Sequence, residues 1–521
     1  MSTAGADAPV ALVTGATDGI GLELARRLDR QGLRLVLVAR RPLAAADVGL
    51  AARHLGVQAD LARPAEACAT VGHALRSAGI ERLDLLVHNA ALGSYGPLER
   101  EPAGRLHEQL AVDLAAPMQL TQALLPRVRA ARGRIVFVSS VAAQLACPDF
   151  AAYSAMKRAL EGFARALRLE ERGRVHVRVV APGGTRTGIH VKSGAPAEEV
   201  MRLSRRWPSA ARVAQALERA ARGRRWHRTL GAANAVGGWL GRHAPRLADR
   251  LLGRPRTWEP PCTPAAAPAA QGRPRRALVT GAADGIGRAL ARRLLEAGWQ
   301  VEGVDVDRAR MAALPALRWH ACDLAQGEAV QALGRTLATG EPFDLVVHNA
   351  GISATGRFAK QAPDAWQAVL AVNLAAPLRL TPMLLAAGRV RQGGTLAFIA
   401  SLSHQVGYPG AAAYAASKDG LAGYARSVRA AVRGRGLHVL VACPGPVRTE
   451  HARRHAPPGS DESRRMPPED VADALVAGVH RRRALVIPGA ASRVAAWLGE
   501  WLPCVTDRIM VRSILERLPP P

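Results

Sequence analysis

Two pairs of a tyrosine and a lysine four residues apart are the groups in this 521-residue chain best suited to chemistry. They are Tyr153 with Lys157 and Tyr414 with Lys418. Side chains at positions i and i+4 share one helix face, so each ammonium group can lie beside a phenol. A nearby cation lowers a tyrosine pKa from about 10 toward neutrality, which makes the hydroxyl a usable general acid or base. A solvated helix face would give the same spacing, but a chain with only five tyrosines places both pairs at matching points of a repeat.

A glycine-rich segment opens each half of the chain. The segment Thr14-Gly15-x-x-x-Gly19-x-Gly21 follows an apolar run and begins an amphipathic stretch, and Gly281, Gly285 and Gly287 repeat it. The first glycine permits a tight turn, the second lets backbone N–H groups approach a pyrophosphate, and the third allows close packing of helix on strand. Glycines alone are weak evidence, but a strand before, a helix after and a second copy predict a nucleotide site.

These motifs belong to an internal repeat that covers most of the chain. The repeated segments are Ala11–Gly21 with Ala277–Gly287, His88–Ala91 with His348–Gly351, Val112–Pro117 with Val372–Pro377, and Tyr153–Lys157 with Tyr414–Lys418. Residues 253–276, rich in Pro, Ala and Arg, lack periodicity and predict a linker. We therefore expect an N-terminal domain over 1–252 and a C-terminal domain over 277–521.

Alternating apolar runs and amphipathic stretches position these motifs. In the first half the predicted strands are Val10–Val13, Leu33–Val38, Leu83–Val87, Arg134–Val138 and Val175–Val180, and the predicted helices are Gly19–Arg30, Arg105–Arg129 and Tyr153–Glu171. Continuously apolar strands that alternate with helices predict an α/β fold with two Rossmann-like doubly wound parallel-sheet domains in tandem. The ligand then belongs at the carboxyl ends of the strands.

Charge and cysteine content narrow the class of function. The net charge of +29 would suit nucleic acid, but the arginines are spread over both halves, without a basic helix, an aromatic strip or zinc spacing, so we predict no nucleic-acid partner. The six cysteines lie far apart, which predicts neither disulfides nor a metal site. The chain has no room for a signal peptide before its first strand and no run of 18 apolar residues, so we expect a cytoplasmic protein that does not span a membrane.

The ordered set of motifs resembles the short-chain dehydrogenase/reductase family in both halves. It comprises T-G-x-x-x-G-x-G, a segment similar to N-N-A-G, S-x(12)-Y-x-x-x-K and a P-G loop, and it covers nearly the whole chain apart from the linker. The resemblance implies an NAD(P)-dependent enzyme that interconverts a secondary alcohol and a ketone, both small molecules.

The resemblance also implies roles for individual residues. Ser140 and Ser401, each 13 residues before its tyrosine, would bind the substrate oxygen, and spacing disfavours the neighbouring Ser139 and Ser403. The tyrosines would exchange the proton, and the lysines would bind nicotinamide-ribose hydroxyls. The cofactor residues implied in this way are Gly15, Gly19, Ile20, Gly21, Asp60, Asn89 and Thr187 in the first half, and Gly281, Gly285, Ile286, Gly287, Asp323, Asn349 and Thr449 in the second.

The two halves depart from the family pattern unequally. Asn373 fits the fourth position of a catalytic tetrad, but its counterpart is Asp113, and Ala91 replaces the glycine found at Gly351. We therefore expect the C-terminal half to be catalytic, while the N-terminal half is either catalytic or a degenerate copy that binds nucleotide or serves as a scaffold.

The end of the second strand predicts opposite cofactor preferences. Asp305 can accept hydrogen bonds from ribose hydroxyls and repels a 2′-phosphate, so the C-terminal half should prefer NAD(H). The aligned N-terminal residues Ala39, Arg40 and Arg41 remove the acid and add guanidinium groups suited to phosphate, so that half should prefer NADP(H). The alternative interpretation is that Arg40 and Arg41 are only two more arginines of an arginine-rich chain and have no role in binding a phosphate.

Each half ends in an amphipathic tail, at Trp239–Leu252 and Val494–Leu518. Such helices pack over a cleft or at an interface more often than they lie on a membrane, so packing is favoured. The resemblance implies pairing of the two halves as an intrachain pseudo-dimer, with homo-oligomers as a further option.

Three functions compete: a bifunctional enzyme, a single active C-terminal dehydrogenase, and a peripheral-membrane reductase of lipidic substrates. The substrate itself is not encoded in any motif.

Overall fold

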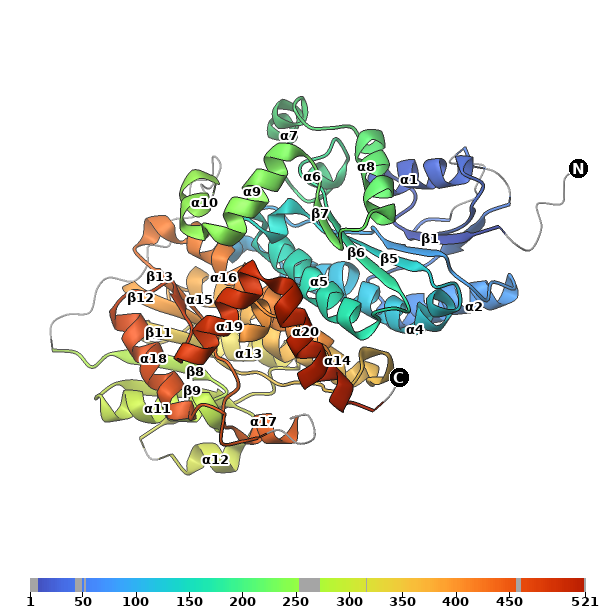
Figure 1. The fold of residues 1–521 in the computed structure, drawn as a ribbon. Coiled ribbons are helices and arrows are strands. Elements are labelled where there is room, and N and C mark those ends of the chain that lie inside the picture. The colour runs from blue at the N-terminus through green and yellow to red at the C-terminus, as the bar shows by residue number, and fades with distance from the viewer. Residues whose placement is uncertain are drawn as a thin grey trace, which may run out of the picture. The chain divides into compact units, whose positions relative to one another are not determined.

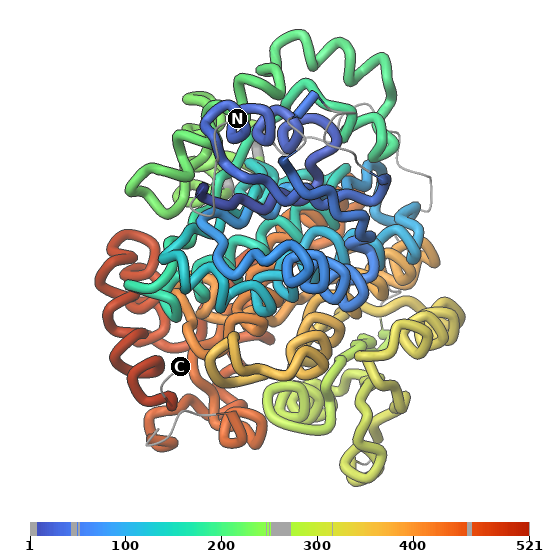
Figure 2. The backbone as a smooth tube through the Cα atoms, turned by 90° about the vertical axis from the view of Figure 1, so that its right-hand side faces the viewer, coloured from blue at the N-terminus to red at the C-terminus, as the bar shows by residue number. Residues whose placement is uncertain are grey.

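A seven-stranded parallel sheet forms the centre of each half of the chain. The computed structural model describes residues 8–42, 49–50, 53–252, 272–314, 316–455 and 461–519, which form two units. The strand order is β3-β2-β1-β4-β5-β6-β7 in the first sheet and β10-β9-β8-β11-β12-β13-β14 in the second. This doubly wound order confirms the predicted fold class. Figure 2 traces the backbone of the first unit from blue to green and that of the second from yellow-green to red.

The N-terminal unit contains every predicted element. Its strands are β1 Val10–Thr14, β2 Arg34–Ala39, β3 Leu55–Gln58, β4 Leu85–His88, β5 Arg134–Val138, β6 His176–Ala181 and β7 His227–Thr229. Its helices are α1 Gly19–Arg30, α2 Pro64–Ser77, α3 Ala103–Leu110, α4 Ala116–Ala130, α5 Ala151–Glu170, α6 Ile189–Lys192, α7 Ala197–Ser204, α8 Ala210–Arg222, α9 Ala232–His243 and α10 Pro245–Leu252. The edge strands β3 and β7 were not predicted because they are short and only partly apolar.

The C-terminal unit repeats this order. Its strands are β8 Arg276–Thr280, β9 Gln300–Asp305, β10 Arg318–Ala321, β11 Phe343–His348, β12 Val390–Ile399, β13 His438–Ala442 and β14 Leu485–Val486. Its helices are α11 Gly285–Glu296, α12 Arg308–Ala312, α13 Gly327–Leu337, α14 Pro363–Leu370, α15 Ala376–Ala386, α16 Ala412–Ala431, α17 Glu450–Arg454, α18 Pro468–His480, α19 Ala490–Trp501 and α20 Pro503–Ser513. Of the predicted linker, residues 253–271 lie outside the described residues, so the domain boundaries stay a prediction.

Helices cover both faces of each sheet, which explains why the strands are continuously apolar. In the first unit α1 and α8 pack together on one face, and α2 and α4 pack together on the other (Figure 1). The equivalent pairs in the second unit are α11 with α18 and α13 with α15. In a doubly wound sheet of this kind, a ligand site is expected at the carboxyl ends of the central strands.

The predicted helix Arg105–Arg129 is interrupted by a π-helical turn at Ala111–Ala115. The same turn occurs at Ala371–Ala375 between α14 and α15. The cause is local, because Pro117 and Pro377 carry no N–H to bond the carbonyl four residues earlier. Each turn places one polar side chain, Asp113 or Asn373, in the interior with no exposed surface.

The stretch Pro363–Ala386, which contains α14 and α15, is the one helical stretch among the described residues that is long and apolar enough to cross a membrane. Its most apolar window is 78% buried inside the protein, as expected of a core helix.

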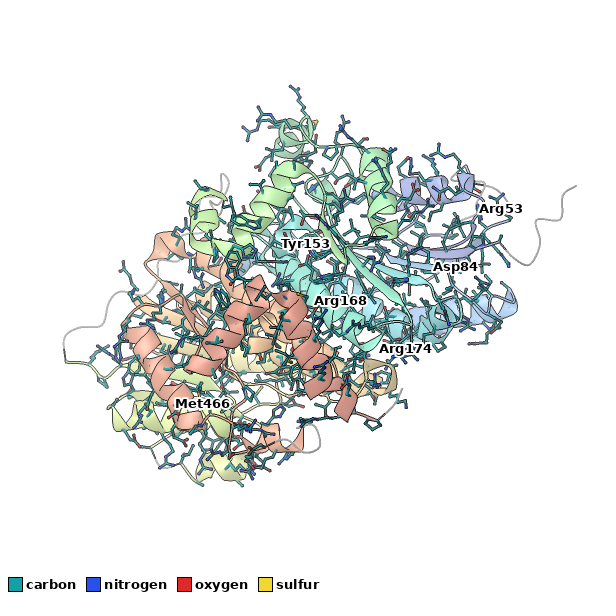
Figure 3. All side chains as sticks on the ribbon, viewed as in Figure 1. Arg53, Asp84, Tyr153, Arg168, Arg174 and Met466 are labelled. Carbon is teal, nitrogen blue, oxygen red and sulfur yellow. The ribbon has the colours of Figure 1, made fainter. Side chains whose placement is uncertain are left out.

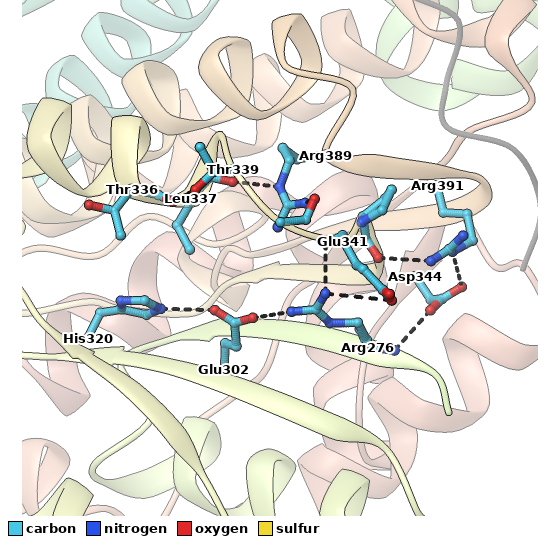
Figure 4. A network of polar contacts seen from close by, with 12 residues as sticks. Arg276, Glu302, His320, Thr336, Leu337, Thr339, Glu341, Asp344, Arg389 and Arg391 are labelled. Atoms are coloured by element: carbon cyan, nitrogen blue, oxygen red, sulfur yellow. Dashed lines mark hydrogen bonds and ion pairs between the residues drawn. The ribbon is translucent and has the colours of Figure 1, made fainter. Parts of the chain in front are cut away.

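An ionic network ties the amino-terminal ends of the strands in the second unit (Figure 4). Glu302 lies between Arg276 and His320, whose Nε2 is 2.9 Å from its carboxylate, while Asp344 accepts a hydrogen bond of 2.9 Å from the Arg276 backbone N–H. Burial alone would raise the pKa of Glu302, but its two basic neighbours hold it below its ordinary value. Because ligands of such sheets bind at the carboxyl ends, this network serves the stability of the sheet.

Candidate active site

An asparagine holds the glycine loop at the carboxyl end of the first strand in each unit. Asn89 Nδ2 donates to the carbonyl oxygens of Thr14 and Gly15 at 3.1 and 3.2 Å. Asn349 makes the equivalent bonds of 2.9 and 3.1 Å to Thr280 and Gly281. Gly281 has φ +69°, a conformation that disfavours other residues. The asparagines predicted to support the cofactor cleft therefore act by fixing the shape of the loop.

The third glycine of the loop brings the helix against the strand end. A Cβ atom at Gly287 would overlap the Gly281 carbonyl oxygen and lie 2.5 Å from Asn349 Nδ2. At the second glycine, Gly285, a Cβ atom would meet only the side chain of Thr449. The loop is thus packed tightly on its inner side, while its outer side faces Thr449 from the P-G loop. This shallow glycine cradle fits a dinucleotide pyrophosphate at the helix N-terminus.

The lysines predicted to be catalytic lie buried beside their tyrosines, as the i, i+4 spacing predicts. Lys157 Nζ is 5.6 Å from the centre of the Tyr153 ring on α5, where Figure 3 labels that tyrosine. Lys418 Nζ is 5.9 Å from the Tyr414 ring on α16. Burial lowers the pKa of Lys418 to about 8. Burial also lowers the pKa of Lys157, although the charge of Asp113 opposes that effect.

Each lysine also contacts the end of a central strand. Lys418 Nζ donates to the Ile399 carbonyl oxygen at 2.8 Å, whereas Lys157 Nζ lies 3.4 Å from the Val138 carbonyl oxygen. The ammonium group is therefore held less closely in the N-terminal unit.

The two predicted serines begin a short 3₁₀ turn directly after these strands. Ser140 and Ser401 each accept a backbone hydrogen bond of 3.2 Å, from Ala142 and Ser403 respectively. The competing Ser139 instead donates to Glu161 at 2.8 Å in the interior, away from solvent.

Tyr414 departs from the simple expectation that a lysine lowers its pKa. Burial raises the pKa of Tyr414 to about 12, and a hydrogen bond with Ser401 opposes that rise only in part. Burial is the largest effect on this pKa, and the Lys418 Nζ lies 5.9 Å from the ring centre. The proton therefore rests on the tyrosine, and Ser401 is already in hydrogen-bond contact with it.

The fourth position differs between the units in both charge and bonding. Asn373 accepts a bond of 2.8 Å from the Ile352 N–H and donates to the Ile352 carbonyl at 2.9 Å and to Ser417 Oγ at 3.0 Å. Asp113 accepts a bond of 2.8 Å from the Leu92 N–H and lies 3.9 Å from Lys157 Nζ. Burial raises the pKa of Asp113 to about 6, against the opposing effects of Lys157 and the Leu92 N–H.

In the C-terminal unit Gly351, whose aligned residue is Ala91, lies close to Lys418. A Cβ atom at Gly351 would lie 3.0 Å from Lys418 Nζ and 3.4 Å from Asn373 Oδ1. The first distance is closer than real Cβ atoms usually approach, so the lysine must give way. Ala91 adds such a methyl group at the aligned position of the N-terminal unit, where Lys157 Nζ lies 3.4 Å from the strand carbonyl.

The residues predicted for the adenosine end lie at the carboxyl ends of the second and third strands of each unit. Asp305 accepts hydrogen bonds from the backbone N–H groups of Val306 and Ala283 at 2.8 and 3.0 Å, so it also orders the glycine loop. Arg40 and Arg41 are exposed, and the charge of Arg41 reaches Asp18 in the glycine loop. Asp60 and Asp323 each accept a bond from the backbone two residues later.

Several residues near the sites carry no sequence signal, because the two copies differ there. The Tyr408 ring lies 6.2 Å from the Tyr414 ring, and its aligned residue is Cys147. On α17 the pKa of His451 falls to about 4, first because of burial and also through the charges of His455 and Lys418. In the N-terminal unit Trp207 packs against His190 at 4.6 Å. The substrate side of each site is therefore built differently.

Comparison with known proteins gives the same assignment to both halves. The family model described as short chain dehydrogenase matches residues 9–197 and 275–458. The 11-beta-hydroxysteroid dehydrogenase 1A of Arabidopsis thaliana is 36% identical over 181 residues, which cover 33% of this chain and 51% of the relative. The acetoacetyl-CoA reductase of Shinella zoogloeoides is 33% identical over 184 residues, 34% of this chain and 76% of the relative. The chain thus spans about half the length of the plant relative.

One solved structure shows the same fold over nearly the whole chain. An N-terminal ketoreductase from the macrolactin assembly line matches 95% of this chain and 89% of its own, with a TM-score of 0.58 at 15% identity. A short-chain dehydrogenase from Sphingobium yanoikuyae in complex with NADPH matches 45% of this chain and 96% of its own, with a TM-score of 0.39 at 24% identity.

The packing of the glycine loop predicts that Gly287→Ala damages the C-terminal nucleotide site. The new methyl group has to displace the Gly281 carbonyl or the Asn349 amide, and such overpacking typically costs about 1–3 kcal/mol of stability. We expect the affinity for NADH, measured by fluorescence titration, to fall by about tenfold or more. Gly434→Ala is the matched control, since its Cβ atom meets nothing within 4 Å. Equal affinities of the two variants would contradict the assignment.

The crowding at the lysine predicts that Gly351→Ala slows the C-terminal unit. A methyl group 3.0 Å from Lys418 Nζ has to move the ammonium group away from its partners. We expect kcat to fall by about tenfold or more, because displacements of 1 Å can cost about 10² in rate. The reverse change, Ala91→Gly, should raise the rate of the N-terminal unit. If neither substitution changes its own unit, the crowding has no role in the rate.

Proposed function

The chain belongs to the short-chain dehydrogenase family in both halves, and from that premise we propose that it is an NAD(P)-dependent oxidoreductase interconverting a secondary alcohol and a ketone. The observation that carries the proposal is the joint placement of Ser401, Tyr414 and Lys418 at the carboxyl edge of a nucleotide-binding sheet. That arrangement supplies a proton donor, a partner for the substrate oxygen and a buried cation within one unit.

In the C-terminal unit each residue has a distinct part in the proposed reaction. A bound nicotinamide supplies or accepts the hydride at the substrate carbon. Ser401 and Tyr414 share the substrate oxygen, and in reduction the Tyr414 hydroxyl gives up its proton as the carbonyl becomes an alcohol. Lys418 then stabilises the phenolate that remains. Asn373 fixes the loop at Ile352 and, through Ser417, the catalytic helix itself.

We assign the same reaction type to the N-terminal unit. Ser140 keeps the turn geometry of Ser401, and Lys157 keeps its distance from the tyrosine ring. Asp113 and Ala91 favour the alternative of a degenerate copy that binds nucleotide without turnover. The intact set of serine, tyrosine and lysine makes an active unit the better explanation, and each unit can be assayed in a chain whose other tyrosine is phenylalanine.

The proposed cofactors are NADP(H) in the N-terminal unit and NAD(H) in the C-terminal unit. The exposed Arg40 and Arg41 have no neighbouring acid at position 39 and suit a 2′-phosphate. The Asp305 carboxylate occupies the equivalent place in the other unit and disfavours that phosphate. Binding of opposite cofactors would let one chain catalyse reduction in one unit and oxidation in the other.

The tail helices favour a second candidate, a peripheral-membrane reductase of lipidic substrates. Large apolar side chains are exposed on them, among them Trp239 on α9 and Trp497 and Trp501 on α19. The relative from Arabidopsis thaliana is named for a hydroxysteroid, an apolar ketone/alcohol pair. A panel of short methyl ketones, β-keto esters and long-chain ketones, with the matching alcohols, distinguishes the two candidates by which class is turned over.

The proton-donor role predicts that Tyr414→Phe nearly abolishes turnover by the C-terminal unit. Measured in a chain that also carries Tyr153→Phe, the rate should fall by a factor of about 10² or more. NADH affinity should stay nearly unchanged, since the phosphates are held at the glycine loop. A rate equal to that of the Tyr153→Phe chain alone would refute the assignment.

The adenosine end predicts that Asp305→Ala with Val306→Arg moves the C-terminal unit toward NADP(H). Repulsion disappears and a phosphate partner is added, and both elements are needed for a switch. We expect the NADP/NAD ratio of kcat/KM to rise by about tenfold or more, as one charge-assisted hydrogen bond is worth roughly 1.5–3 kcal/mol. The converse pair, Ala39→Asp with Arg40→Val, should move the N-terminal unit the other way. Unchanged ratios in both units would show that cofactor choice lies elsewhere.

A further inference from the structure

Gln109 and Asp113 together replace the single asparagine of the other copy. We infer that this pair places a carboxylate that is charged at neutral pH beside Lys157, which holds Tyr153 in its proton-bearing form and so adapts the N-terminal unit to carbonyl reduction. The statement about reduction depends on the proposed function, whereas the statements about bonding and proton occupancy can be tested without turnover.

The first step is an exchange of hydrogen bonds between aligned residues. In the C-terminal unit the Ile352 carbonyl accepts its bond of 2.9 Å from Asn373. In the N-terminal unit the aligned Leu92 carbonyl accepts a bond of 2.9 Å from Gln109 Nε2 instead. Gln109 is aligned with Val369, which has no donor, and both side chains are fully buried. The glutamine thus makes the bond that an aspartate cannot donate.

The second step is the loss of the other acceptor that faces the fourth position. Asn373 donates to Ser417 Oγ at 3.0 Å, but the residue aligned with Ser417 is Met156. Asp113 therefore accepts a hydrogen bond from a backbone N–H. At the place of the Ser417 hydroxyl, which accepts a bond from Asn373, it faces Met156, which has no hydroxyl. The Leu92 N–H bonds one carboxylate oxygen of Asp113, while Oδ2 has no hydrogen-bond partner among the described residues.

The third step concerns charge. Two cations face Asp113: Lys157 on α5, 3.9 Å away, and Arg105 on α3, whose charge also reaches it. Burial raises the pKa of Asp113 to about 6, so the carboxylate is charged at neutral pH. Its negative charge offsets that of Lys157, the cation that would otherwise stabilise a Tyr153 phenolate. Reduction needs the tyrosine as an acid, so retention of its proton extends the working range of the reductive reaction to higher pH.

The direct test is an ultraviolet absorbance titration of tyrosinate in the full chain. The signal of Tyr153 is the difference between each chain and the same chain carrying Tyr153→Phe. We expect Asp113→Asn to lower the midpoint of that signal, because the charge of Lys157 beside the phenol is then no longer offset. An unchanged or higher midpoint would overturn the inference.

Grafting the pair into the other unit provides the matched control. Asn373→Asp alone deprives Ile352 and Ser417 of their donor, so the C-terminal unit should lose stability. Adding Val369→Gln should recover part of that stability, as Gln109 does for the Leu92 carbonyl. If the double variant is no more stable than the single one, the glutamine does not compensate and the first step fails. Loss of turnover with the expected midpoints would contradict only the proposed function.

The raised pKa of Asp113 also predicts a pH dependence of stability. The folded unit binds this proton more tightly than the unfolded chain does, so the group stabilises the fold below about pH 4 and loses that contribution as the pH rises through about 6. Chemical denaturation between pH 4 and 7 should show a slope that Asp113→Asn removes. Gln109→Leu, which keeps the carboxylate, should retain the slope but lower stability throughout. An identical slope in the Asp113→Asn chain would show that the carboxylate does not titrate in this range.

Discussion

Each unit is organised around one ammonium group buried at the carboxyl edge of a parallel sheet. A buried lysine is costly unless polar groups surround it, and its pKa falls as a result, as it does for Lys418. The strand supplies a carbonyl oxygen, the helix supplies a tyrosine one turn away, and the π-helical turn supplies an amide or a carboxylate. Each of these elements is positioned by packing that the lysine does not itself provide. The lysine can keep its place only because sheet, helix and turn meet at that edge.

The glycine loop is the second constraint, and it is steric where the first is electrostatic. Helix α11 approaches strand β8 so closely that no side chain fits at Gly287, and Asn349 bridges the loop to the end of β11. The same amide therefore joins the two strands between which the nucleotide is expected to bind. Asp305 adds a third tie from β9 to the loop, which couples cofactor choice to loop order. A substitution at Asp305 changes both the charge and the backbone of the site.

The sequence predicted the parts of this arrangement that depend on short-range rules. The repeat, the central strands, the glycine loops and the tyrosine–lysine pairs follow from periodicity and spacing, and the resemblance supplied the serines. The π-helical turn was missed because the apolar periodicity of Arg105–Arg129 is that of one amphipathic helix. The single extra residue that Pro117 causes in the preceding turn hardly changes that periodicity. Tyr408, His451 and Trp207 were missed because they reach the sites through tertiary packing and have no counterparts in the other copy.

The two units of this chain contain the same candidate site with different residues around its lysine, so they can be compared directly. The serine, tyrosine and lysine are common to both units, so the differences lie in the residues that contact the lysine from behind. In one unit a glycine and an asparagine let the ammonium group approach the strand carbonyl to 2.8 Å and leave its charge unopposed. In the other an alanine and an aspartate hold it at 3.4 Å and partly neutralise it, while Gln109 takes over the hydrogen bond that the aspartate cannot make. Gln109 thus completes the hydrogen bonding around a lysine that has a different neighbour, which supports our proposal that the N-terminal unit works with different proton chemistry.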